Sequence, residues 1–208
     1  MEGETEQRYL VWLQSKINNC DRAKYSVKFD CKIEKDPKRR VKELTMLSST
    51  IITHIFDRES ESPVHGKQFQ RTLDRMREAE SLGKHITYTM GYSNFSFELW
   101  IILHKEDWYT PLNYQHQYLA PLNRIFHEQF SDLHEYKQKD AFARILEKLS
   151  LYDVWSAIDC AKQITQQHKE NGYILQHYKG YSYYKENPSL SVWQIVEKIL
   201  LDCSLSQP

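Results

Sequence analysis

The chain has 208 residues, enough for one hydrophobic core with an appendage, and its 28 Lys and Arg balance its 28 Asp and Glu. A formal net charge of zero argues against a generally basic nucleic-acid coat, although local basic patches are compatible with it. Aromatic residues make up 13% and hydrophobic residues 40% of the sequence, which is typical of a folded chain and excludes general disorder.

The cysteines and the apolar runs exclude further classes. The four cysteines are far apart and form no Cys-x-x-Cys or Cys/His cluster, so neither a zinc site nor a disulfide framework is expected. Free thiols suit the cytosol. No apolar run approaches the roughly 18 residues of a membrane span, and the acidic first residues do not form a signal peptide. We expect a cytoplasmic protein with no membrane partner.

The first predicted helix begins near Thr5, which can cap it. Glu4 and Glu6 lie where the helix dipole favours acids, so both have a structural explanation. Glu2 stands before Gly3, and an acid before a glycine turn that opens a helix is a candidate site acid, although a dipeptide is a weak signal. The inward face has helical spacing: Tyr9, Leu10, Leu13 and Ile17.

Residues 25–34 alternate between apolar and polar side chains, which predicts a half-exposed strand near a sheet edge. Pro37 then starts a helix from Lys38 to about Leu47. This helix carries four cations: Lys38, Arg39, Arg40 and Lys42. We interpret them as a solvated helix face rather than as a patch that contacts phosphate.

Residues 51–56 predict a buried strand, because they are mostly β-branched or aromatic and carry no formal charge. Asp57 and Glu59 follow it two residues apart, so in an extended chain their side chains leave on the same side. The crevice beyond the carboxyl ends of strands is where ligands bind in open α/β sheets. Two carboxylates there suit Mg²⁺ or Mn²⁺. An acid after a strand is also a common turn former or helix cap, and spacing alone favours that interpretation.

A polar loop over residues 60–66 leads to a predicted charged helix over 67–81, with Gly83 as its C-cap, and to a strand over 86–90. The alternation of helix and strand predicts an α/β fold with a mainly parallel sheet. Such a sheet normally begins with a strand before the first helix. The given sequence starts at Met1, so either the protein begins further upstream or the site lacks this supporting strand, which would leave Glu2 on a frayed end.

An apolar helix is predicted over residues 93–104, capped by Ser93 or Asn94. Glu98 and His104 are its polar exceptions. A carboxylate in that setting must be paired, bound to a cation or protonated. Glu98 and His104 lie six residues apart and share no helix face, so each alone is better interpreted as a satisfied buried polar group than as a ligand.

Three motifs, in order along the chain, resemble those of the RloB-like family. Residues 2–6 resemble its EGxTE opening, residues 56–59 its acidic strand end, and residues 93–104 its SNPxFELWLLLH signature. The resemblance is clear over residues 1–110. Phe95 stands where proline is usual, and the second acid of the strand-end pair is Glu59 rather than aspartate.

The family is similar to Toprim-type proteins, whose fold places a glutamate and a DxD pair around Mg²⁺. The resemblance implies a Toprim/Rossmann-like core over residues 1–110, with Glu2, Asp57 and Glu59 as metal ligands. Glu98 would be a further catalytic residue facing the same crevice. It also implies a nuclease effector of a phage-defence system, acting on DNA or RNA, with a possible partner ATPase.

The remaining residues, 111–208, predict a helical C-terminal half, with helices near 118–130, 139–149 and 150–169 and a last one starting at Pro188 and Ser189. A Tyr-rich loop over residues 172–188 interleaves aromatic and basic side chains. This pattern is equally typical of a surface that stacks bases and of a loop packed on its tyrosines, against the core.

Two functions follow. The first is a Mg²⁺-dependent nuclease that uses Glu2, Asp57, Glu59 and Glu98, with His54 and His104 as candidate proton-transfer groups. The second is a non-catalytic Toprim-like subunit that docks an ATPase or nucleic acid.

Overall fold

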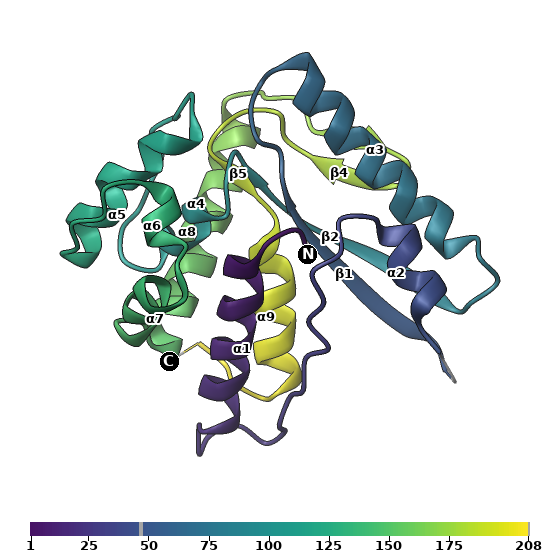
Figure 1. Ribbon diagram of the computed structural model, residues 1–208, viewed down its shortest axis with the longest axis horizontal. Coiled ribbons are helices and arrows are strands. Elements are labelled where there is room, and N and C mark those ends of the chain that lie inside the picture. The colour runs from purple at the N-terminus through teal and green to yellow at the C-terminus, as the bar shows by residue number, and fades with distance from the viewer. Residues whose placement is uncertain (46–47, 208) are drawn as a thin grey trace.

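The computed structural model describes residues 1–45 and 48–207 and has a mixed α/β fold (Figure 1). A small sheet crosses the molecule diagonally, and helices cover both of its faces. Within the described residues, no helix has the length and apolar character that crossing a membrane would require.

The sheet has three strands in the order β1-β2-β5. The predicted central strand is confirmed as β1 (Thr50–Asp57), which runs parallel to β2 (Ile86–Asn94) from the Thr50–Ile86 pair to the Asp57–Ser93 pair. The short β5 (Ser189–Leu190) is antiparallel to the end of β2. The expectation of a mainly parallel sheet is therefore met by only one strand pair, because the third strand comes from the end of the chain and runs the opposite way.

One face of the sheet is covered by α2 (Pro37–Glu43) and α3 (Pro63–Glu80). The hairpin of β3 (Gln176–Tyr178) and β4 (Tyr181–Tyr183) joins this layer. The rings of Phe56, Phe69, Tyr92 and Tyr183 pack against one another there. Tyr183 is thus a core residue, which favours packing over base stacking for this part of the Tyr-rich loop.

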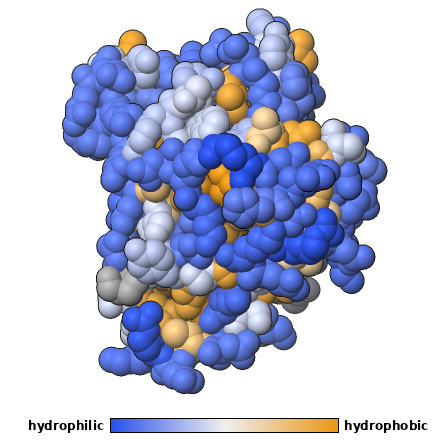
Figure 2. All heavy atoms as spheres, turned by 90° about the vertical axis from the view of Figure 1, so that its left-hand side faces the viewer, coloured by the Kyte–Doolittle hydropathy of each residue, from blue (hydrophilic) through white to orange (hydrophobic). Residues whose placement is uncertain are grey.

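The other face carries the larger hydrophobic core, under α1 (Glu4–Asn18), α4 (Glu98–Leu103), α8 (Leu151–Glu170) and α9 (Val192–Asp202). Outside these lie the shorter η1 (Gln115–Tyr118), α5 (Leu119–Phe126), α6 (Leu133–Tyr136) and α7 (Lys139–Glu147). Figure 2 shows the face that these outer helices form, and it is mostly hydrophilic with scattered apolar areas. The predicted helical character of residues 111–170 is confirmed.

Several local predictions were wrong. Residues 25–34 form no strand, because backbone groups there bond to side chains of α1, as when Phe29 donates to Gln14. The first helix begins at Glu4 with Gly3 as N-cap, so Thr5 does not cap it. β2 extends through both predicted caps of the apolar helix, Ser93 and Asn94, and α4 begins only at Glu98.

Other helix ends also differ from the prediction. α3 begins at Pro63 with Ser62 as its cap, four residues earlier than expected, and its C-cap is Ser81 rather than Gly83. α2 ends at Glu43; its predicted end at Leu47 lies outside the described residues. The last helix follows Ser191, because Ser189 and Leu190 pair with β2 instead of starting it.

The backbone of Met1 and Glu2 lies beside the end of β1. The amide of Glu2 donates to the Ile55 carbonyl at 3.2 Å, and the amide of Glu34 donates to the Met1 carbonyl at 3.0 Å. The peptide unit that joins Met1 and Glu2 is therefore held on both sides by backbone hydrogen bonds, as in a strand, and the expectation of a frayed end was wrong.

Candidate functional site

The end of β1 directs Asp57 towards the helical half of the molecule. Alternate side chains of a strand point to opposite faces. Phe56 packs under α3, whereas Ile55 packs in the core of α1 and α9, so Asp57 shares the face of Ile55. Its Oδ1 atom is buried and has no hydrogen-bond partner among the described residues. A buried carboxylate oxygen without a partner is costly unless it is protonated or bound to a cation.

Glu98 approaches the same place from the first turn of α4. Its side chain is only 1% exposed, and its Oε1 atom lies 3.2 Å from the Nζ atom of Lys137. The hydroxyl of Ser96 donates to the other carboxylate oxygen. The interpretation of Glu98 as a paired buried acid is confirmed, and its partner is a lysine that the sequence analysis did not single out.

Glu6 is the acid that the sequence analysis missed. It is buried, at 5% exposure, and lies close enough to Asp57 and Glu98 for the three carboxylates to repel one another. Gly3 makes room for it, because a Cβ atom at Gly3 would stand 2.6 Å from a carboxylate oxygen of Glu6. The spacing of Gly3 and Glu6 in the opening motif was the available signal, and the helix-dipole explanation concealed it.

Glu2 and Glu59 complete the group at its outer edge. Burial raises the pKa of Glu2 to about 7, and the charges of Glu6 and Glu59 add to this effect while Lys35 opposes it. Glu59 pairs with His65, whose Nε2 atom lies 3.3 Å from the carboxylate.

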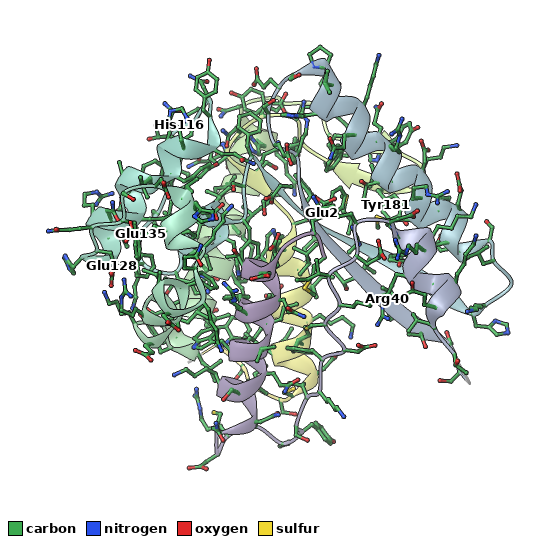
Figure 3. All side chains as sticks on the ribbon, in the orientation of Figure 1. Glu2, Arg40, His116, Glu128, Glu135 and Tyr181 are labelled. Atoms are coloured by element: carbon green, nitrogen blue, oxygen red, sulfur yellow. The ribbon has the colours of Figure 1, made fainter. Side chains whose placement is uncertain are left out.

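These acids line one cleft of about 540 Å³. We call it the acidic cleft, and define it by Glu2, Glu6, Asp57, Glu59, Glu98 and Lys137. Figure 3 shows Glu2 in the middle of the molecule, between the helical half that carries Glu135 and the half that carries Arg40. The cleft thus lies where α1, β1 and α4 meet.

Negative charge in the acidic cleft is only partly compensated. Burial and then the neighbouring Glu6 and Glu98 raise the pKa of Asp57 well above its usual range, and burial raises the pKa of Glu6. Burial alone would lower the pKa of Lys137, but the carboxylates of Glu98, Asp57 and Glu6 outweigh it and raise that pKa. Lys137 thus faces three acids, and although Arg8 and Lys35 also line the cleft, acids outnumber cations there, which favours the binding of an added cation.

The donors fit a hard divalent cation in their chemistry, because Mg²⁺ and Mn²⁺ prefer carboxylate oxygens, and the unpaired Oδ1 atom of Asp57 is a free ligand atom. As the side chains lie, residues 1–45 and 48–207 contain no group of three or more His, Cys, Asp or Glu that could hold one metal ion. The three-ligand set Glu2, Asp57 and Glu59 stays a prediction. Mg²⁺ usually takes only one or two carboxylates and completes its shell with water and phosphate.

Neither histidine that the sequence suggested for proton transfer lies in the acidic cleft. His54 packs against Phe56 on the α3 face, and burial lowers its pKa to about 3. Burial lowers the pKa of His104 to about 4; its Nδ1 donates to the Trp100 carbonyl, so its Nε2 accepts from the Tyr9 hydroxyl. Both are neutral core residues. Two other histidines are near the site: His134 lines the acidic cleft, and His65 lies beside Glu59.

The acidic cleft makes stability depend on pH. Because burial raises the pKa of Glu2 from about 4.5 to about 7, the folded chain keeps a proton that the unfolded chain has lost in that window. Ionisation of Glu2 therefore lowers the free energy of unfolding in EDTA as pH rises from about 4.5 to 7. The buried neutral His54 and His104, whose pKa values are lowered to about 3 and about 4, act in the opposite direction over part of this range, because the unfolded chain binds protons there that the folded chain does not. We therefore expect the melting temperature of Glu2→Gln to rise relative to that of the wild type as pH rises over this range. Glu61→Gln, an exposed neighbour, should keep the wild-type slope; equal slopes in wild type and Glu2→Gln would contradict the prediction.

Residues 93–104, which resemble the family signature, contribute both to the acidic cleft and to the packing around it. Asn94 donates from its amide nitrogen to the carbonyls of Tyr184, Lys185 and Glu186 at 3.0–3.1 Å, which fixes the Tyr-rich loop to the end of β2. Glu98 faces the acidic cleft, and His104 closes the helix in the core.

Of the comparisons with known proteins, the one with family models gave a match, and it covers nearly all of the chain. Searches of curated proteins and of solved structures gave no match. The model of the family described as RloB-like protein matches residues 1–199. The chain therefore belongs to the RloB-like protein family.

Proposed function

We propose that the chain is a Mg²⁺- or Mn²⁺-dependent nuclease of the Toprim type, the effector of a phage-defence system, which cleaves phosphodiester bonds in DNA or RNA. The observation that carries the proposal is the convergence of Glu6, Asp57 and Glu98 in one cleft, where Lys137 lies against Glu98. A cluster of buried acids is costly for folding, and a bound cation that takes part in chemistry explains why it exists.

The parallel pairing of β1 with β2 supports the Toprim interpretation, but only for these two strands. In that arrangement Glu2 is the strand-end glutamate, Asp57 the first acid of the pair and Glu59 the second. Glu98, brought to the same cleft by α4, is a fourth catalytic acid.

The proposed roles follow from the position of each side chain. Asp57, Glu59 and Glu2 would hold the metal, which when bound supplies a water of lowered pKa and stabilises charge on the phosphoryl oxygens. Lys137, fixed by Glu98, directs a positive charge into the cleft for a phosphate oxygen. His65, beside Glu59, is placed to move a proton at its Nε2 atom.

Cleavage of nucleic acid by the purified chain tests the proposal. We expect cleavage with Mg²⁺ or Mn²⁺ and none in EDTA. Glu59→Gln should lower the rate by about 10–100-fold, the cost of weakening a metal site. Glu61→Gln makes the same change two residues away, on an exposed side chain, and should cut at the wild-type rate. Equal rates for the two variants would remove Glu59 from the mechanism.

The second candidate is a non-catalytic subunit that uses the same core to dock an ATPase or nucleic acid. The Lys137–Glu98 ion pair favours it, because it compensates part of the acidic charge without a metal. Titration with Mn²⁺ separates the two functions. A nuclease should gain about 5–10 °C in melting temperature at saturating Mn²⁺, whereas a docking subunit should not respond.

A further inference from the structure

A second cleft, of about 510 Å³, lies next to the acidic cleft on its α3 side. The segment before α2 forms one wall and contributes Lys35, and α3 forms the other. We call it the basic cleft, and define it by Lys35, Lys67, Gln68, Arg71 and Thr72.

The three cations that define the basic cleft are exposed and form no ion pair within the described residues. Lys67 and Arg71 lie one helical turn apart on α3, so they point the same way. The third cation, Lys35, lies in the segment before α2.

The neighbouring cations behave differently. Arg75, one turn further along α3, is held 2.6 Å from Asp36, and Lys38 is held 2.7 Å from Glu78. In a chain of zero net charge, three cations without an ion pair along one cleft are therefore a local concentration of positive charge, which Glu2 offsets only at the end shared with the acidic cleft.

The two clefts are continuous. Glu2 and Lys35 line both of them, and the charge of Lys35 acts on Glu2. A polyanion held by Lys67 and Arg71 would therefore lead directly to the carboxylates. Repulsion from the acids opposes the entry of an anion into the acidic cleft, and the cations beside it offset this.

We infer that the basic cleft binds the sugar–phosphate backbone of a nucleic-acid strand and leads it into the acidic cleft. The inference rests on the proposed nuclease function, and adds where the substrate lies and what part of it is recognised. The described residues that line the basic cleft carry no aromatic ring for a base to stack on. Recognition therefore goes through phosphate and is independent of base sequence.

Binding is measured in a chain that cannot cut, so that affinity and cleavage are separate. In an Asp57→Asn background, Lys67→Gln/Arg71→Gln is compared with Arg22→Gln/Lys169→Gln. This control also removes one Lys and one Arg, from exposed positions outside the cleft that form no ion pair among the residues that the structure describes. Gln is a good helix former, so α3 should persist, as circular dichroism would check. The probes are fluorescently labelled single-stranded DNA, single-stranded RNA and duplex DNA, read by anisotropy over a range of salt.

We expect Lys67→Gln/Arg71→Gln to weaken binding at least about tenfold. For single strands, we expect the slope of log K against log salt to become shallower by about 1.4, that is, about 0.7 for each lost phosphate contact. The control should bind as its parent, and strands of different base sequence should bind alike. The three probes decide which nucleic acid fits.

Equal affinity of the cleft variant and the control, or no binding of any probe by the parent, would overturn the inference. Its failure differs from that of the proposed function. Metal-dependent cutting by the wild type, with unchanged binding in the cleft variant, refutes the basic cleft alone. Weakened binding in the cleft variant, without any metal-dependent cutting by the wild type, refutes the nuclease alone.

Discussion

An Asp57→Asn chain is expected to melt higher than the wild type in EDTA and yet to lose nuclease activity. Burial and the neighbouring Glu6 and Glu98 raise the pKa of Asp57, so ionising it costs folding free energy. Asparagine has the same shape without the charge, and should raise the melting temperature at about pH 8 by roughly 2–5 °C. The same change removes the proposed metal ligand, and should lower cleavage by about 10²–10³-fold.

A substitution that raises stability and lowers activity distinguishes a functional acid from an acid that stabilises the fold. Differential scanning calorimetry with EDTA and with Mn²⁺ measures the first effect, and a cleavage assay the second. The wild type should be stabilised by Mn²⁺ and Asp57→Asn should not be. Asp21→Asn, an exposed aspartate near the end of α1, should leave both unchanged. If Asp57→Asn destabilised the chain in EDTA, Asp57 would be a structural acid.

Lys137→Met is expected to be strongly destabilising without metal. Lys137 is the cation that faces Glu98, whose side chain is 1% exposed, while Asp57 and Glu6 lie close by. Removing it leaves those acids uncompensated. For a fully buried pair the loss is about 3–5 kcal/mol, but the Lys137 side chain is 43% exposed, so we expect about 2 kcal/mol, or roughly 4–8 °C in melting temperature.

A divalent cation should restore much of this loss, because it can compensate the same acids. Thermal denaturation in EDTA and with increasing Mn²⁺ measures both effects. Lys139→Met, at an exposed lysine two residues further along, removes the same charge outside the acidic cleft and should change neither. Stability that Mn²⁺ does not restore in Lys137→Met would show that the acidic cleft does not take a metal.

The core elements of the fold could be predicted because their patterns are local. The run of β-branched and aromatic residues from Ile51 to Phe56 indicates a buried strand wherever it stands. The spacing of Tyr9, Leu13 and Ile17 gives α1 in the same way. The prediction of a strand over residues 25–34 was wrong because an alternation of apolar and polar residues indicates only that the two sides of a segment face different surroundings. The partners of its backbone groups were side chains of α1, such as Asn18, which bonds to both backbone groups of Val27.

The candidate site was predictable only in part. Asp57 and Glu98 were singled out correctly as acids in unusual settings, because each follows or interrupts an apolar run. Glu6 was set aside, since an acid in the first helical turn has a sufficient local explanation. Lys137 has no signal in the sequence at all, because its importance depends on α6 placing it against Glu98, 39 positions earlier in the chain.

Short-range patterns were enough to predict the parallel pair of strands, the main helices that cover it and membership of the RloB-like family, since apolar periodicity and short motifs are properties of neighbouring residues. The folded chain was needed to find that Glu6 joins Asp57 and Glu98, that Lys137 lies against Glu98, and that Lys67 and Arg71 line the same cleft as Glu2. Charge acts through space, so the balance of charge in a cleft depends on which distant segments the fold brings together.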